Sequence, residues 1–113
     1  MSISSDTLRG HTDTIILTQL IRGDNYGYEI NKNIQQRTGG AYGFKEATLY
    51  TAFKRLEQNG LISSYWGEDG PGARRRYYAI TEKGKEQWAE NVKEWETPRE
   101  LLNALIATEE EAP

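Results

Sequence analysis

EATLYTAFKRLEQNGLI, residues 46–62, is the stretch that decides the fold of this chain. Asn59 and Gly60 form a typical C-terminal signal, so a helix is expected to end there. Apolar side chains recur at three- and four-residue spacing, which predicts that the helix buries one side: Leu49, Ala52, Phe53 and Leu56. The opposite side of the helix carries small, hydroxyl, amide and cationic groups.

The polar side of this helix suits the major groove of DNA. Small residues near the helix N-terminus allow a close approach to base edges, while hydroxyl and cationic groups bond bases and phosphates. An ordinary solvated helix face has a similar composition, so the neighbouring sequence decides between the two interpretations. The candidate DNA contacts on this side are Ala47, Thr48, Tyr50, Thr51, Lys54 and Arg55.

A basic hairpin is expected directly after the helix. Residues 61–66 and 75–80 are short runs with high β-propensity, and the glycine-rich residues 67–72 between them predict the tip. The alternative interpretation is a solvated hairpin whose charges protect a sheet edge. Guanidinium groups suit phosphates and the minor groove, so the three arginines after the tip are further candidate DNA contacts: Arg74, Arg75 and Arg76.

Two more helices are expected before this segment. Apolar residues recur at helical spacing from Leu8 to Ile21. Residues 26–34 then carry an apolar side chain at every fourth position, beginning with Tyr26, until two glycines end the helix. Three helices followed by a basic hairpin predict a mainly α fold with a β-hairpin wing (α+β), a winged helix-turn-helix DNA-binding domain over residues 1–80.

The remaining residues, 81–113, are predicted to form a C-terminal dimerisation helix with an acidic tail. Thr81 is a suitable N-cap and Glu82 a favourable acid in the first turn. One small domain cannot cover the apolar stripe that follows, so we expect a homodimer, whose two-fold symmetry matches a palindromic operator. The alternative is that the helix packs wholly onto the first helix. The stripe follows four- and three-residue spacing: Trp88, Val92, Trp95, Leu102 and Ile106.

A proline lies within this last helix. Thr97-Pro98-Arg99-Glu100 has the form of a capping box with proline at the first helical position, a pattern typical of a new helix start. We therefore expect a kink or break near Thr97, and a frayed acidic tail beyond Ile106.

Composition excludes several classes of protein. The 113 residues fit one domain, and the absence of cysteine and the single histidine argue against disulfides, thiolate metal sites and Ser/His catalysis. We therefore expect no cofactor and no enzymatic activity. The N-terminus lacks a basic leader and no apolar run approaches the ~20 residues that cross a bilayer, so a cytoplasmic protein without a membrane partner is expected.

The distribution of charge is more informative than its sum. The net charge is −3, but residues 1–44 sum to 0, residues 45–85 to +3 and residues 86–113 to −6. The middle third can therefore offer DNA phosphates a positive face, although chance clustering on a solvated surface gives the same asymmetry.

Together these motifs resemble a known family. Residues 46–62, followed by RRRYY at 74–78 and TEKG at 81–84, resemble the PadR family of bacterial regulators, and SSYWG at 63–67 resembles the branch of the lactococcal multidrug-resistance repressor. The resemblance covers residues 7–106. It implies a winged helix with a dimerisation helix, and repression of an efflux-pump or stress operon that a planar aromatic compound relieves.

The same resemblance implies an effector site at the dimer centre. Trp95 is expected to face its symmetry mate and to stack planar compounds between the two rings, with Val92, Trp88 and Asp13 as further ligand contacts. Aromatic faces suit flat, often cationic compounds, but both tryptophans also fit a plain dimer core. Arg99 stands where the drug-responsive branch carries an acidic residue, so the preferred charge of the effector stays open.

Two other functions remain to be distinguished. A regulator of this family can answer to phenolic acids or to no small molecule, and a winged-helix protein-interaction module would not bind DNA at all. Salt-dependent DNA affinity separates the regulators from the interaction module.

Overall fold

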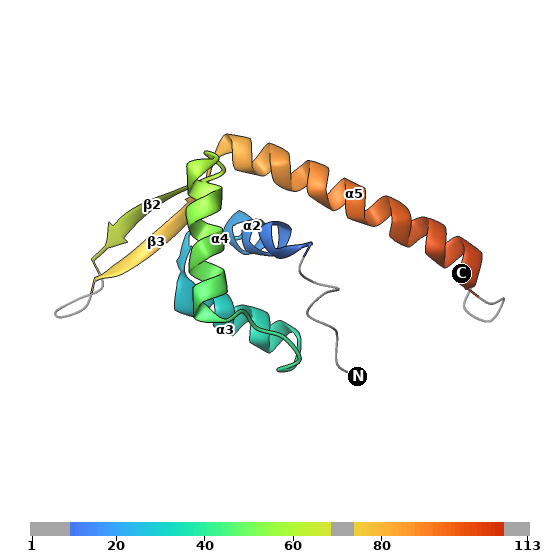
Figure 1. Cartoon of the computed structure of the whole chain (residues 1–113), viewed down its shortest axis with the longest axis horizontal. Coiled ribbons are helices and arrows are strands. Elements are labelled where there is room, and N and C mark those ends of the chain that lie inside the picture. The colour runs from blue at the N-terminus through green and yellow to red at the C-terminus, as the bar shows by residue number, and fades with distance from the viewer. Residues whose placement is uncertain (1–9, 69–73, 108–113) are drawn as a thin grey trace.

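The computed structural model describes residues 10–68 and 74–107. Three helices precede a hairpin and a long helix follows it, so the predicted α+β architecture is confirmed (Figure 1). Leu8, the centre of the predicted tip and the acidic tail lie outside the described residues. The elements in chain order are α2 (Thr12–Ile21), β1 (Asn25–Tyr26), α3 (Gly27–Arg37), α4 (Glu46–Gln58), β2 (Ile62–Gly67), β3 (Arg75–Ile80) and α5 (Glu82–Ile106).

The sheet has one strand more than the predicted hairpin. β3 lies in the centre with β1 on one side and β2 on the other, all antiparallel. Tyr26 therefore lies in β1, paired with Tyr77, and its assignment to the second helix was wrong. Its φ of −113° and ψ of 161° are extended, because the backbone is held in the sheet ladder until α3 begins one residue later.

The core lies where α2, α3 and α4 meet the sheet. The predicted inner side of α4 is confirmed, because Leu49, Ala52, Phe53 and Leu56 are all buried. The ring of Phe53 stacks on that of Tyr78 with 4.0 Å between centroids, which fixes α4 against β3. Burial of these side chains anchors one side of α4 and leaves its other side to solvent.

The turn between α3 and α4 is held by a side chain of α3. Asn31 Oδ1 accepts a hydrogen bond from the Phe44 amide at 2.7 Å, and Asn31 Nδ2 donates to the Phe44 carbonyl at 2.8 Å. Phe44 is itself buried. These contacts set the orientation of α4 relative to α3, the two helices of the helix-turn-helix.

α5 begins as predicted. The side chain of Thr81 accepts a hydrogen bond from the Gly84 amide at 3.0 Å, as an N-cap does. Gly84 is required at this point, because a Cβ atom there would lie 2.1 Å from the Leu61 carbonyl oxygen. The start of α5 is thereby pressed against the end of α4 and the start of β2.

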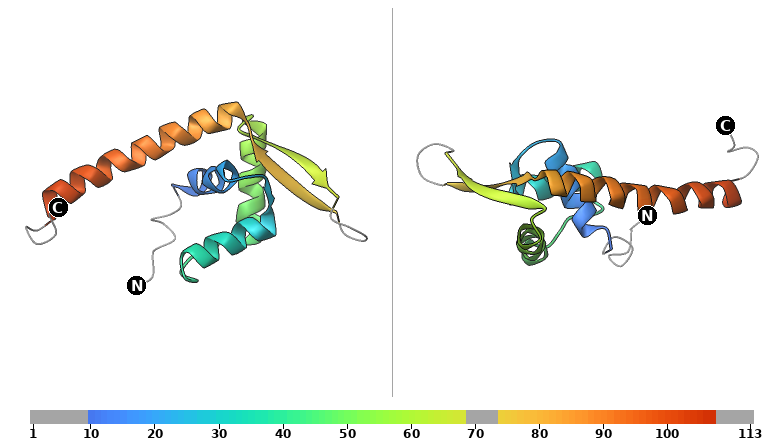
Figure 2. Two further views of the ribbon diagram at one scale, coloured as in Figure 1. Left: turned by 180° about the vertical axis from the view of Figure 1, so that it is seen from behind. Right: turned by 90° about the horizontal axis from the view of Figure 1, so that it is seen from above.

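Of the kink or break predicted near Thr97, the break was wrong. α5 runs without interruption from Glu82 to Ile106 with Pro98 inside it, and it curves only gently (Figure 2). Thr97 does not cap a new helix, because its hydroxyl donates back to the Lys93 carbonyl at 3.1 Å. The surrounding turn is exposed, so water can satisfy the carbonyl that loses its usual partner at Pro98.

Only the first half of α5 packs on the domain. Trp88 packs against the core, and its Nε1 donates to Thr18 Oγ1 of α2 at 2.8 Å. The second half projects away from the helices and the sheet, which gives the chain extents of 59 × 30 × 24 Å. Complete packing onto the first helix was therefore wrong for the described chain, since several large apolar side chains stay exposed: Trp95, Leu101, Leu102, Leu105 and Ile106.

Candidate nucleic-acid interface

The outermost row of α4 consists of Ala47, Thr51, Lys54 and Gln58. They follow four-, three- and four-residue spacing opposite the buried side of the helix, and all four are exposed. The row begins with small side chains and ends with longer polar ones. A helix of this shape can approach base edges with its N-terminal half and phosphates with its C-terminal half.

The other predicted contacts of α4 flank this row on two sides. Tyr50 lies on the side of the wing, the hairpin formed by β2 and β3, where its ring meets Phe53 edge to face at 5.6 Å. Thr48 and Arg55 lie on the side of α2 and α5, since they line one hollow with Trp95. The structure therefore divides the six predicted residues of α4 between an outer row and two flanks.

Arg55 is engaged within the protein. Its guanidinium forms a salt bridge with Asp13 in the first turn of α2, and both side chains remain partly exposed. Asp13 was predicted to contact an effector and Arg55 to contact DNA. The structure brings the two residues together, which the sequence pattern did not indicate.

The wing is fixed to α4 by a polar network. Ser64 Oγ donates to Glu57 Oε2 at 2.6 Å, and Arg76 Nη2 donates to Ser64 Oγ at 2.7 Å. Arg76 Nη2 also lies 3.7 Å from Glu57 Oε1. Arg76 therefore joins the strand to the helix, in addition to any contact it makes with DNA.

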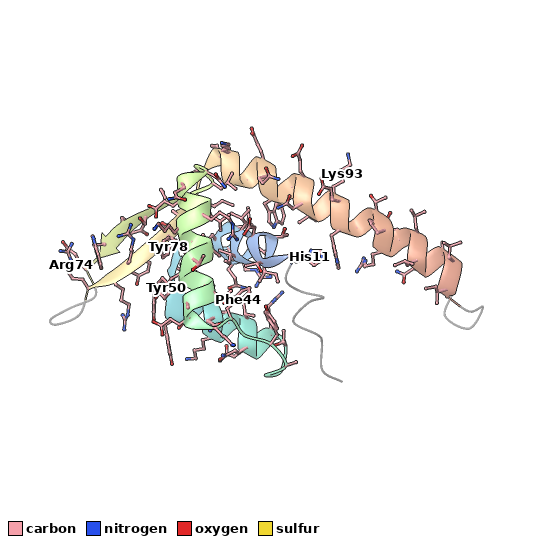
Figure 3. All side chains as sticks on the ribbon, in the orientation of Figure 1. His11, Phe44, Tyr50, Arg74, Tyr78 and Lys93 are labelled. Carbon is pink, nitrogen blue, oxygen red and sulfur yellow. The ribbon has the colours of Figure 1, made fainter. Side chains whose placement is uncertain are left out.

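The three arginines of the wing have different surroundings. The guanidinium carbon of Arg75 lies 4.8 Å from the centroid of the Tyr26 ring. The guanidinium carbons of Arg74 and Arg76 each lie 5.7 Å from the centroid of the Trp66 ring. Figure 3 shows Arg74 at the end of the hairpin that is farthest from the helices. Each guanidinium is thus held over an aromatic face, and Arg76 in addition keeps its contacts with Ser64 and Glu57.

A cleft of about 740 Å³ separates α4 from the wing. Tyr50 and Lys54 line it from the helix and the arginines of residues 74–76 line it from the strand, with Glu57 as an acid among them. A wall of cations, hydroxyls and aromatic rings suits a sugar–phosphate backbone. This cleft unites most of the predicted DNA contacts.

Two tyrosines of the wing stay uncharged well above neutral pH. The Tyr65 hydroxyl donates to Asp24 Oδ2 at 2.7 Å, and this bond to a carboxylate raises the pKa of Tyr65. Burial raises the pKa of Tyr78. Neither hydroxyl therefore adds a negative charge that would repel phosphates.

Sequence analysis missed Tyr28 and Lys32 at the start of α3. Both line a hollow of about 280 Å³ with Tyr50, and Tyr28 is 71% exposed. The first helix of a helix-turn-helix crosses the DNA backbone, so an exposed hydroxyl and a cation here are candidate phosphate contacts. Gly27 permits this approach, because a Cβ atom there would lie 2.7 Å from Tyr50 Oη.

The predicted effector contacts do not all share one surface. Trp95 and Val92 line a mostly apolar hollow of about 290 Å³ with α2 residues that include Ile15 and Thr18. Asp13 lies in an adjoining hollow that Trp95 also lines, whereas Trp88 is partly buried against the core. The guanidinium carbon of Arg99 lies 4.9 Å from the centroid of the Trp95 ring.

Neither a metal site nor a membrane-spanning helix is found among the described residues. Between residues 10 and 68 and between 74 and 107, no group of three or more His, Asp or Glu side chains could hold a metal ion. None of the described helices combines the length and apolar content needed to span a bilayer.

Comparison with known proteins gives one family. Residues 16–90 match the family model described as "Transcriptional regulator PadR-like family". The uncharacterized protein X of Lysinibacillus sphaericus is 45% identical over 104 residues, which are 92% of this chain and 95% of that protein. The transcriptional regulator YqjI of Escherichia coli is 30% identical over 95 residues, and this chain spans only 44% of its length.

Solved structures agree with the family match. A transcriptional regulator from Clostridium thermocellum is 51% identical, with a TM-score of 0.82 over 92% of this chain and 98% of that one. Bacillus subtilis PadR, solved in complex with operator DNA, is 24% identical, with a TM-score of 0.64 over 71% of this chain and 45% of that one. At this identity the second likeness shows the fold, a winged helix.

Proposed function

Because the chain belongs to the PadR-like family of transcriptional regulators, we propose that it is a homodimeric repressor that binds a palindromic operator. The repressor controls an efflux-pump or stress operon, and a planar aromatic compound bound at the dimer centre releases it. The observation that carries the proposal is the cleft between α4 and the wing, where tyrosines and cations from both sides converge.

DNA is contacted by two elements. The outer row of α4 enters the major groove, while Lys54 and the arginines of the wing contact the backbone on either side of the cleft. Bacillus subtilis PadR, which shares the fold, is solved in complex with operator DNA, and this supports DNA as the ligand of the winged helix. Tyr28 and Lys32 add phosphate contacts at the start of α3.

A second copy of the chain covers the far half of α5. Leu105 is 81% exposed and Ile106 71% exposed in the single chain. Each apolar Å² removed from water contributes about 25 cal/mol, so a self-complementary contact along this helix is favourable. Two DNA-binding units related by a two-fold axis then address two half-sites of one operator.

The effector binds where α5 passes the first turns of α2. Trp95 and Val92 supply an aromatic face and an apolar wall there, and the second copy closes the open side. A flat aromatic compound stacks on Trp95. Arg99 lies over the same ring, so the ligand has to displace it or use the other face.

The experiment is a titration of labelled DNA from upstream of the chain's own gene with purified protein, with and without a flat aromatic dye. Salt-dependent binding that the dye weakens supports the proposal. Binding that the dye leaves unchanged keeps the repressor but contradicts this effector class, and a phenolic acid is then the next compound to test. Binding no tighter than to random DNA contradicts the repressor.

A variant assigns the effector site. Trp95→Ala is expected to lose affinity for the dye and to keep its affinity for DNA, because Trp95 lies on α5 outside the cleft. Lys93→Ala is the control, since this cation is also exposed on α5 but does not line the effector hollow. Retained dye affinity in Trp95→Ala places the effector elsewhere.

A further inference from the structure

Trp66 is a large aromatic side chain exposed near the end of the wing. Trp66 is 53% exposed, whereas Phe44, Phe53 and Tyr78 of the same domain are buried. It is also the last residue but one of β2, directly opposite Arg76 in the register of the hairpin. Neither the core nor the sheet ladder requires an indole at this place.

The ring lies close to two cations. Arg74 and Arg76 are each 5.7 Å from its centroid, and both are on the face of the sheet that carries Trp66. A guanidinium stacked on an aromatic ring keeps its donors at the edge while its freedom to rotate is reduced. The two arginines therefore lose less conformational entropy when they bind a phosphate than free side chains would.

Trp66 also faces the proposed DNA site. It lines the cleft between α4 and the wing together with Tyr50 and Lys54. Ser64 and Tyr78 lie on the same face of the hairpin, toward α4, whereas Tyr65 and Tyr77 stack on each other on the opposite face. Of the two neighbouring aromatics Tyr65 and Trp66, only Trp66 is therefore directed to the cleft.

We propose that Trp66 is both a DNA-contacting and a positioning residue. Its ring packs on the deoxyribose of the backbone that enters the cleft, and it holds the guanidinium edges of Arg74 and Arg76 toward the flanking phosphates. This inference rests on the proposed function, since it assumes that duplex DNA occupies the cleft. It adds an aromatic contact from the wing to the cations and tyrosine hydroxyls that line the cleft.

The first test uses the native side chain. The chain has three tryptophans, so labelling with 5-fluorotryptophan gives a fluorine signal for each, assigned with Trp66→Phe, Trp88→Phe and Trp95→Phe. On titration with duplex DNA from upstream of the chain's own gene, we expect the Trp66 signal to shift. The Trp88 signal, from a ring that packs against the core, is the internal control.

The second test measures affinity and its salt dependence. Trp66→Ala is expected to bind the duplex about tenfold more weakly and to reduce the salt slope by about one, because a stacked contact is lost and an arginine is no longer held in place. Trp66→Phe should restore most of both. Tyr65→Phe is the matched control, since it removes only a hydroxyl on the opposite face of the same strand.

The outcomes separate this inference from the proposed function. If wild-type protein does not bind the duplex, the proposed function fails. If wild-type protein binds but the Trp66 signal does not move, or Trp66→Ala keeps both affinity and salt slope, the repressor stands and the role of Trp66 is overturned. The fluorine measurement decides even if Trp66→Ala does not fold.

Discussion

The guanidinium of Arg99 covers one face of Trp95, with 4.9 Å between its central carbon and the ring centroid. Both residues lie on the half of α5 that the domain leaves exposed. An exposed cation–π contact is worth about 0.5–1 kcal/mol, which a stacking ligand on the same face must replace. Arg99 thus acts as a built-in competitor for the proposed effector.

Removing this competitor should strengthen the binding of a flat dye. For Arg99→Ala we expect about two- to fivefold tighter binding, measured by quenching of tryptophan fluorescence during a titration with an uncharged planar dye. Lys93→Ala, which removes an exposed cation from the same helix, should leave the affinity unchanged. Weaker binding to Arg99→Ala would instead mean that the guanidinium itself contacts the ligand.

Gly84 leaves no room for a side chain. A Cβ atom there would meet the Leu61 carbonyl oxygen at 2.1 Å and Ile80 Cγ1 at 2.7 Å. The backbone of α5 must move to accommodate it, so Gly84→Ala is expected to lower the free energy of unfolding by about 1–3 kcal/mol. Thermal unfolding followed by circular dichroism measures the loss.

Gly10→Ala is the matched control for this change. The new methyl group at Gly10 would find no atom within 4 Å, and the residue lies just before α2. Its melting temperature should equal that of the wild type. An unchanged melting temperature for Gly84→Ala would show that α5 is not pressed against Leu61 in solution.

At the scale of elements, α2 and α4 are joined by the salt bridge between Asp13 and Arg55. The same two side chains line the hollow that Trp95 reaches from α5. Arg55 cannot give all its donors to a phosphate while it is paired with Asp13, and the carboxylate itself repels DNA. The pair therefore connects the proposed effector region to the proposed DNA contact.

Neutralising Asp13 should increase the affinity for DNA. For Asp13→Asn we expect about two- to fivefold tighter binding of the upstream duplex at low salt, since an exposed ion pair holds Arg55 by no more than about 1 kcal/mol. Fluorescence anisotropy across a series of salt concentrations measures the effect. Glu90→Gln makes the same change of charge on the exposed surface of α5 and should have little effect. Weaker binding of Asp13→Asn would mean that Asp13 positions Arg55 for DNA.

The elements that sequence patterns predicted best are those in which burial follows a simple period. α4 shows this, because the spacing of Leu49 and Phe53 alone indicates which side faces the core. β1 could not be predicted in this way, since two residues carry no period and pair only because β3 lies beside them. The break predicted at Pro98 was wrong because a capping pattern is local. Whether α5 continues through the proline depends instead on solvent reaching the turn before Pro98.

The candidate site, too, could be predicted from the sequence only in part. Residue types indicated that Arg55 and the arginines of the wing could meet phosphates, but their partners Asp13 and Glu57 are distant in the sequence or on another element. Trp66 and Tyr28 carry no pattern that distinguishes them from other aromatic residues. Only the fold places them at the cleft and beside Tyr50.

At the scale of the whole molecule, the two halves of α5 lie in different surroundings. Its first half completes the domain through Trp88, while its second half extends away from the wing and from α4 (Figure 2). A second copy on this half does not obstruct the proposed DNA face. Changes there should therefore alter the oligomeric state without unfolding the domain.

Leu105→Asp tests this separation. Leu105 is 81% exposed in the single chain, so the change should cost the folded domain little, yet it places a charge in the proposed dimer contact. We expect a monomer by sedimentation velocity, an unchanged circular dichroism spectrum, and at least about tenfold weaker binding to a two-half-site duplex, because the second domain no longer contributes effective concentration.

Ala104→Asp is the control, since this neighbouring exposed residue is turned about 100° around α5 from Leu105 and is not one of the large apolar side chains exposed there. It adds the same charge and should keep both the dimer and the affinity. The affinity of Leu105→Asp for a duplex with a single half-site should match that of the wild type, because one domain suffices there. If Leu105→Asp stays dimeric, the exposed apolar surface around Leu105 is not the interface. If it is monomeric and still binds two half-sites as tightly, dimerisation is not what gives the repressor its affinity.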